Sequence, residues 1–117
     1  MRVLICGDRN WSDEKVIEKV IIELPVTTVI IQGGARGADS IAEKIARQRG
    51  MDVLTFRAEW EKYGRSAGPI RNREMLIEGM PDLVIAFHQD LEHSKGTKNM
   101  VEQARKAGIQ VNIYGGK

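Results

Sequence analysis

The chain has one cysteine, three prolines and few aromatic residues, and it contains no long hydrophobic run. With Cys6 as the lone cysteine, no disulfide can form within the chain, which suits a reducing compartment. The apolar run Val3–Cys6 is too short for a signal peptide, and no run approaches the ~20 residues that cross a bilayer. We therefore expect a cytoplasmic protein without a membrane partner.

Familiar cofactor patterns are missing as well. No second cysteine and no suitably spaced carboxylate accompany His88 and His93, so we predict no metal site and give the two histidines surface or hydrogen-bonding roles. The glycine-rich stretch that begins at Gly33 is neither a Walker A loop nor a G-x-G-x-x-G fingerprint. The sequence assigns no particular cofactor.

Charge is modest in total but uneven along the chain. The formal net charge is +2 and the pI is about 8.8, short of the pI above ~9 that is typical of nucleic-acid-binding domains. Basic residues gather in or beside the expected loops and helix starts, namely Arg9, Arg36, Arg65, Arg71, Arg73, Lys95 and Lys98. This clustering favours an anionic partner at one end of the fold.

Strand-like and helix-like patterns alternate along the chain. Short β-rich runs cover residues 3–6, 27–32, 52–56, 82–87 and 109–114, and patterns of helical period cover 13–24, 38–49, 69–78 and 97–106. Residues 57–68 are expected to form a polar, aromatic loop, with Pro69 as the first residue of the helix that follows. The alternation predicts one α/β domain over residues 1–117, with an open five-stranded, mostly parallel sheet and helices on both faces.

Two glycine-rich turns fall where parallel strands end and helices begin. One holds Gly33, Gly34, Arg36 and Gly37, and the other holds Ser94, Gly96 and Thr97. Right-handed crossovers bring such turns to one edge of the sheet, where helix N-termini and exposed backbone favour phosphate. The alternative is that the glycines only allow tight turns.

Three more positions are candidates for the ligand. Arg71 is expected in the first turn of its helix, where a cation opposes the helix dipole, so a bound anion or a salt bridge would explain it. Arg9 and Trp11 follow the first strand, and Trp11 is a candidate for stacking on a base, whereas Trp60 and Tyr63 are expected to anchor their loop to the core.

Carboxylates near these turns are candidates for catalysis. Asp39, Glu74 and Asp8 are the only well-placed ones, and Asp39 has three possible roles: helix cap, partner of a ribose hydroxyl, or base. Capping is the preferred interpretation.

The motifs GGARGAD (33–39), GRSAGPIRNREM (64–75) and SKGT (94–97) resemble the YspA/cpYpsA-related family of the SLOG superfamily, common in bacteria and their phages. The resemblance covers nearly the whole chain and implies a Rossmann-like fold, nucleotide-related ligands and frequent homo-oligomers. Relatives include the LOG-type phosphoribohydrolases and the DNA-processing protein DprA. Met100 stands where the LOG-type enzymes carry a catalytic glutamate, and Glu102 lies on a different helical face, which puts that hydrolysis in doubt.

The leading hypothesis is a module that senses or sequesters a nucleotide or an ADP-ribose-like ligand. Its phosphates would lie between the two glycine turns, neutralised by Arg36, Arg71 and Arg9. One alternative is a hydrolase of the phosphoribohydrolase or N-glycosidase type. The other is single-stranded nucleic-acid binding, against which the modest net charge argues.

Overall fold

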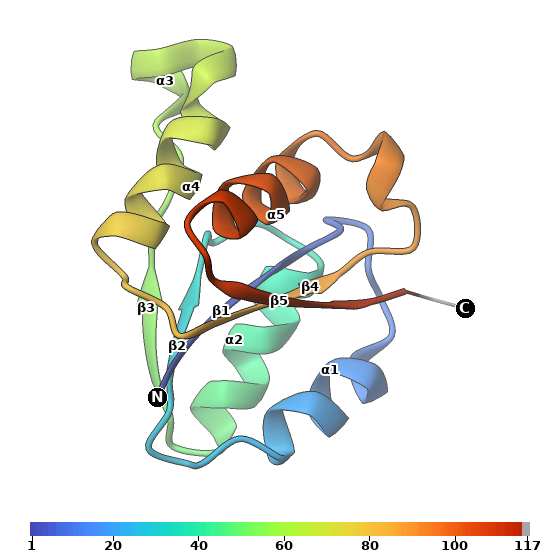
Figure 1. Ribbon diagram of the computed structural model, residues 1–117. Coiled ribbons are helices and arrows are strands. Elements are labelled where there is room, and N and C mark those ends of the chain that lie inside the picture. The colour runs from blue at the N-terminus through green and yellow to red at the C-terminus, as the bar shows by residue number, and fades with distance from the viewer. Residues whose placement is uncertain (116–117) are drawn as a thin grey trace.

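The computed structural model describes residues 1–115 and has a single five-stranded parallel sheet with helices on both faces (Figure 1). The strands are β1 (Arg2–Gly7), β2 (Val29–Gln32), β3 (Asp52–Thr55), β4 (Leu83–Phe87) and β5 (Gln110–Tyr114). Their order across the sheet is β3-β2-β1-β4-β5, and every neighbouring pair is parallel. This confirms the α/β, Rossmann-like expectation.

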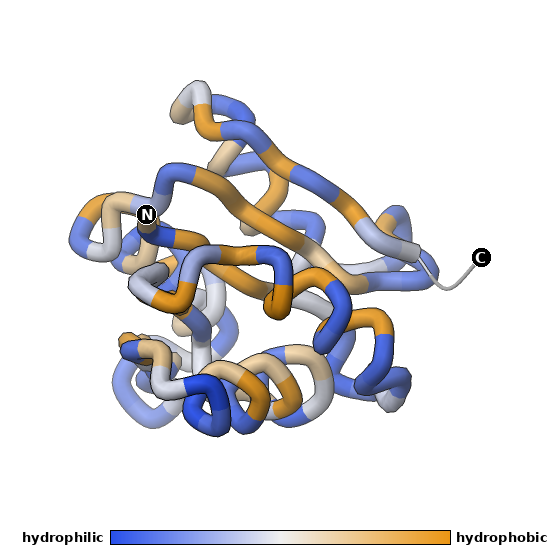
Figure 2. The backbone as a smooth tube through the Cα atoms, turned by 90° about the horizontal axis from the view of Figure 1, so that it is seen from below, coloured by the Kyte–Doolittle hydropathy of each residue, from blue (hydrophilic) through white to orange (hydrophobic). Residues whose placement is uncertain are grey.

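Two helices cover each face of the sheet. The helices α1 (Glu14–Ile22) and α2 (Ala38–Gln48) lie on one face, and α4 (Ala67–Ile77) and α5 (Gly96–Lys106) lie on the other (Figure 1). Each helix turns a stripe of apolar residues inward, as Ile17 and Ile21 of α1 illustrate. The strands between them carry the hydrophobic residues in the middle of the molecule (Figure 2).

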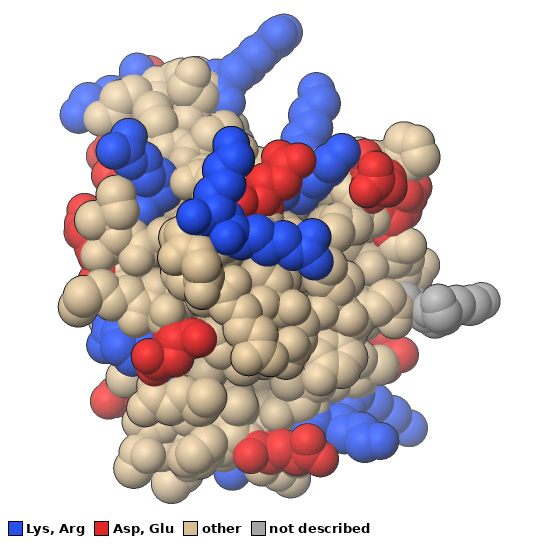
Figure 3. All heavy atoms as spheres, in the orientation of Figure 1, with Lys and Arg blue, Asp and Glu red and all other residues tan. Residues whose placement is uncertain are grey.

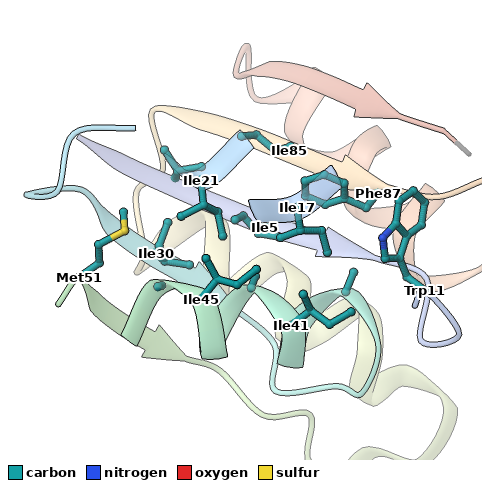
Figure 4. Packing of buried hydrophobic residues seen from close by; sticks show 14 residues of the cluster. Ile5, Trp11, Ile17, Ile21, Ile30, Ile41, Ile45, Met51, Ile85 and Phe87 are labelled. Carbon is teal, nitrogen blue, oxygen red and sulfur yellow. The ribbon is translucent and has the colours of Figure 1, made fainter. Parts of the chain in front are cut away.

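The core is therefore split into two layers by the sheet. The layer under α1 and α2 includes Ile5, Ile30, Ile85 and Phe87, which lie close together in Figure 4. Figure 4 also shows Trp11 beside Phe87 in this layer, at an interplanar angle of 61° and a ring separation of 5.7 Å. The second layer, under α4 and α5, includes Met75 and Met100.

The segment after β3 differs from the expected loop. It holds a one-turn helix α3 (Trp60–Tyr63) and a 3₁₀ turn η1 (Gly64–Ser66), and α4 begins at Ala67, before Pro69. Pro69 is then the third helical residue, where a missing N–H still costs no intrahelical bond. Because Arg71 lies in the second turn of α4, the helix-dipole argument for that residue was wrong.

The sheet order reverses direction at β1. The chain runs outward through β2 and β3 and then crosses to β4 on the other side of β1. In open parallel sheets a crevice forms at such a reversal, outside the carboxyl ends of the strands. Here those ends are Gly7 of β1 and Phe87 of β4, which are paired in register.

None of the helices in residues 1–115 has the length and apolar character that crossing a bilayer requires.

Candidate functional site

A cleft of about 720 Å³ opens at the carboxyl ends of β1 and β4, and we call it the main cleft. This volume falls within the range of about 300–1,000 Å³ that is common for small-molecule sites. Its walls come from the end of β1, the turn after β2, the α3–α4 segment and the turn before α5. The lining includes Cys6, Asp8, Arg9, Asp39, Trp60, Arg65, Arg71, Asn72, His88, Ser94, Lys95, Gly96 and Thr97.

A second hollow, of about 570 Å³, adjoins the main cleft, and we call it the arginine hollow. The two hollows share Arg9, Ala35, Trp60 and Arg71 in their walls. The other lining residues of the arginine hollow are Gly33, Gly34, Arg36, Arg57 and Ala58. Four of its nine lining residues are therefore arginines, and none is acidic.

The first glycine turn is closed by a carboxylate. Asp39 is the second residue of α2 and is only 6 % exposed, and its Oδ2 accepts the backbone N–H groups of Gly33 and Ala35 at 3.1 and 3.2 Å. Two other amides of this turn are engaged: that of Gly34 donates to Gln32 Oε1 and that of Ala38 to the Asp8 carbonyl. The turn is thus held by hydrogen bonds from inside. Asp39 was expected to cap its own helix, and it does not.

Gly37 is held by the first loop of the chain. Its φ of +77° lies in the left-handed region, and a Cβ there would overlap the backbone of Asp8 and Arg9. Gly37 lines neither hollow, so its role is to let the loop after β1 pack on the start of α2.

Burial sets the protonation of two groups in the cleft. Burial raises the pKa of Asp39 to about 6, against the opposing effects of the Ala35 and Gly33 amides and of the Arg71 charge. The pKa of the Cys6 thiol is raised by burial and, further, by the Asp39 charge, so this thiol stays protonated.

Arg71 and Asn72 connect the two glycine turns. The Arg71 guanidinium donates to the carbonyls of Gly33 at 2.9 Å and Phe56 at 3.4 Å, and its Nε donates to Asn72 Oδ1 at 3.0 Å. Asn72, which is 3 % exposed, in turn donates through Nδ2 to the Gly96 carbonyl and to Asn99 Oδ1. Burial lowers the pKa of Arg71, and the nearby Arg9 charge acts in the same direction.

The second glycine turn is more open than the first. The Thr97 amide donates to Ser94 Oγ at 3.1 Å, while a Cβ placed on Gly96 would meet no atom within 4 Å. The amides of Gly96 and Lys98 have no hydrogen-bond partner among residues 1–115. The first turn of α5 therefore offers backbone donors and a partial positive charge to the main cleft.

His88 adds a donor beside Asp8. The Asp90 amide donates to His88 Nδ1 at 2.9 Å, which leaves the proton of the neutral ring on Nε2. That Nε2 lies 4.0 Å from Asp8 Oδ2. The sequence analysis gave His88 only a surface or hydrogen-bonding role, although its place directly after β4 puts it at the edge where the cleft forms.

The structure brings most of the expected site residues together. Those that line the main cleft are Asp8, Arg9, Asp39, Arg71, Ser94, Gly96 and Thr97, and those that line the arginine hollow are Arg9, Gly33, Gly34, Arg36 and Arg71. Glu74 is exposed on α4 and lines neither hollow. Trp60, Arg65, Arg57 and Asn72 were not among the expected site residues.

Trp11 does not take the position expected for it. It is 6 % exposed, its ring packs edge-on against Phe87, and its Nε1 donates to the Asp13 carbonyl at 2.8 Å. The ring is thus part of the core and is not available to stack on a base. Trp60 shows the reverse, because it is 54 % exposed and lines both hollows instead of anchoring its loop in the core.

Comparisons with known proteins place this chain in one family. Residues 1–63 match the family described as "YspA, cpYpsA-related SLOG family". The chain is 41 % identical to the gene 61 protein of Mycobacterium phage D29 over an alignment of 125 residues, which covers 99 % of this chain and 98 % of that protein. The chain belongs to the YspA/cpYpsA-related SLOG family, and this membership points to a nucleotide-related function.

A solved structure supports the fold independently. The chain superposes on the DNA processing protein A (DprA) of Streptococcus pneumoniae with a TM-score of 0.80 and 24 % identity. The match covers 99 % of this chain and 50 % of that one, so the chain spans half the length of this neighbour. The likeness shows a shared fold.

Proposed function

We propose that the protein binds a nucleotide or nucleotide-derived ligand, of which ADP-ribose is one example, with a phosphate at the first turn of α5. The observation that carries this proposal is the open N-terminus of α5 in the main cleft, where Gly96 leaves room for a ligand and Lys95 adds positive charge. The first glycine turn is a less suitable phosphate site, because the amides of Gly33 and Ala35 already donate to the Asp39 carboxylate.

The remaining walls of the main cleft suit the rest of a nucleotide. Asp8 and the Nε2–H of His88 offer an acceptor and a donor for ribose hydroxyls near the end of β1. Trp60 offers an exposed aromatic ring, and Arg65 and Arg71 offer positive charge. A ligand held this way would be sensed or sequestered without any chemical change.

Gly96→Ala tests this proposal. The added methyl group has open space and replaces glycine in the first turn of a helix, so the folded protein should be as stable as the wild type or more so. The same methyl group lies where the phosphate approaches the backbone, so the affinity for nucleotides should fall. Arg105→Gln, in the last turn of α5, is the matched control and should leave affinity unchanged.

The readout is isothermal titration calorimetry with nucleoside 5′-monophosphates, nucleoside diphosphates and ADP-ribose. A wild-type protein that binds none of them contradicts the proposal. A Gly96→Ala variant that binds as tightly as the wild type would exclude the N-terminus of α5 as the phosphate site.

Hydrolysis of an N-glycosidic bond is the second candidate function. It is favoured by Asp39, whose pKa of about 6 suits proton transfer near neutrality, and by the Asp8–His88 pair in the same cleft. Against the LOG-type reaction, Met100 is 1 % exposed and packs in the core, so α5 supplies no carboxylate at that position. Mass spectrometry of the titrated samples distinguishes the two functions, because only an enzyme releases free base.

A further inference from the structure

The arginine hollow is a concentration of unpaired positive charge. Arg9, Arg36 and Arg57 are exposed around it, and Arg71 is half-buried in its wall. Among residues 1–115, no carboxylate lies within 4.0 Å of any of these four guanidinium groups. Arg47, on the outer surface of α2, shows the usual arrangement, since it pairs with Glu43 at 2.9 Å.

Two of the four guanidinium groups are fixed in direction. Arg71 Nη1 donates to the Gly33 carbonyl at 2.9 Å, and Arg57 Nη1 donates to the Gly34 carbonyl at 3.1 Å. Each guanidinium has five N–H donors, and these bonds use only some of them. The first glycine turn therefore holds two arginines through the carbonyl groups of consecutive glycines, while the amides of Gly33 and Ala35 donate to Asp39.

The surface around α3 to α5 is not uniformly basic. Figure 3 shows Lys and Arg side chains grouped over the upper part of the molecule, with Asp and Glu side chains between them. The absence of acidic residues from the wall of the arginine hollow is thus a local property and does not follow from the modest net charge of +2. The four like charges repel one another, and a bound anion relieves that repulsion.

Trp60 stands between the arginine hollow and the main cleft. It lines both, and its ring edge lies beside Gly68 of α4, whose Cβ, if present, would be 3.5 Å from Trp60 Cη2. A methyl group there would be in ordinary contact with the ring, which lies at the start of α4 and remains 54 % exposed. A base or sugar resting on this ring would have a charged subsite on either side.

From this arrangement we infer that the arginine hollow is a second anion subsite, and that the ligand is a small nucleotide with two separated phosphate groups. The inference rests on the proposed function, which places one phosphate at the first turn of α5. The second phosphate would lie among Arg36, Arg57 and Arg71. The nucleoside would lie between the two phosphates, against Trp60. Nucleoside 3′,5′-bisphosphates and 5′-phosphorylated dinucleotides share this chemistry.

The test compares monophosphates with their 3′,5′-bisphosphates, which differ only in the second phosphate, and adds one 5′-phosphorylated dinucleotide. Adenosine 5′-monophosphate, adenosine 3′,5′-bisphosphate, the corresponding guanosine pair and the dinucleotide pApA are titrated calorimetrically into the wild type, Arg36→Gln, Arg36→Gln/Arg57→Gln and Arg105→Gln. Arg36 is exposed and makes no hydrogen bond through its side chain within residues 1–115, so its removal leaves the fold intact. The midpoint of thermal unfolding, compared with that of the wild type, shows whether the double variant is still stably folded.

We expect the ligands with two phosphates to bind the wild type about tenfold or more tightly than the monophosphates do. The reason is that the second phosphate accepts charge-assisted hydrogen bonds from the arginines. In the double variant this ratio should fall to about one while monophosphate affinity stays the same. Arg36→Gln should give an intermediate ratio, and Arg105→Gln the wild-type ratio.

Equal affinity of the wild type for both kinds of ligand would overturn the second subsite and leave the proposed function standing. Binding of none of these nucleotides would overturn both. A 5′-phosphorylated single-stranded oligonucleotide that binds far more tightly than pApA would also overturn the inference, because the arginine hollow would then serve a nucleic-acid backbone and not a small nucleotide.

Discussion

The Oδ2 atom of Asp39 accepts the amide of Gly33 at 3.1 Å, so a carboxylate of the protein occupies the position that an anion would take in the first glycine turn. The hydrogen bonds from the turn to Asp39 brace it from inside, and its carbonyl groups accept from Arg71 and Arg57. The two glycine turns thus differ in role. The first positions arginine side chains, and the second leaves a helix N-terminus open.

Replacing Asp39 by Asn should change how stability depends on pH. The folded protein holds the Asp39 proton up to about pH 6, whereas an unfolded aspartate releases it near 3.8, so Asp39 favours the folded state below pH 4 and loses that contribution as the pH rises through 6. Asn cannot lose a proton. Urea denaturation should therefore show the variant gaining about 2 kcal/mol on the wild type between pH 4 and pH 7.5. A stability difference independent of pH would contradict this.

Replacing Asn72 by Ala should affect both folding and binding. Asn72 is itself buried, and its removal loses the hydrogen bonds to Arg71 Nε and to the Gly96 carbonyl, at a cost of about 1–3 kcal/mol. Nucleotide affinity should fall as well, because Asn72 positions the first turn of α5. Denaturation and calorimetry measure the two effects, and Asn112→Ala, on the edge strand β5, is the control. Full affinity in a destabilised variant would show that Asn72 serves the fold alone.

The two tryptophans should respond in opposite ways to substitution by Ala. Trp11→Ala opens a cavity beside Phe87 and should cost about 3–5 kcal/mol of stability. Trp60→Ala removes a ring that is 54 % exposed, and should change stability little while weakening nucleotide binding. Chemical denaturation followed by nucleotide titration checks both variants. If instead Trp60→Ala destabilises the protein strongly and leaves binding unchanged, Trp60 is a structural residue.

Binding should weaken steeply with salt if the arginines meet phosphate. The guanidinium groups of Arg36 and Arg57 are solvent-exposed, and exposed charges are screened over about 8 Å at physiological ionic strength. Titrations at increasing KCl concentration should show a larger loss of affinity for the wild type than for Arg36→Gln/Arg57→Gln. Parallel salt dependence of the two proteins would mean that these arginines do not contact the ligand.

The fold could be predicted from the sequence because the strands are short and rich in apolar residues and α1, α2 and α5 have a clear helical period, as in the spacing of Ile17 and Ile21. The one-turn helix α3 was missed because four residues carry no periodic signal. The start of α4 was misplaced because Pro69 is compatible with the third helical position as well as the first.

The residues of the site were harder to predict than the fold. Parallel topology alone predicts that the turns gather at one edge of the sheet. The main cleft at that edge is indeed lined by Asp8, Arg9, Asp39 and Gly96. Which of the loop tryptophans is buried depends on tertiary packing. The roles expected of Trp11 and Trp60 were therefore exchanged, because Trp11 is the buried one and Trp60 is the exposed one. The hydrogen bonds from the turn to Asp39 carry no sequence signal, since an aspartate near the start of a helix also fits the role of a helix cap.

The most direct test of the account is an NMR titration of the ¹⁵N-labelled protein with a nucleoside 5′-monophosphate and its 3′,5′-bisphosphate. The account predicts saturable shifts of the amides of Gly96, Thr97 and Lys98 with both ligands, and shifts of the Arg36 and Arg57 side chains with the bisphosphate only. The amide of Gly33, already bound to Asp39, should move least among the glycine-turn amides. Shifts centred on Gly33 and Gly34, with none at the first turn of α5, would contradict the account.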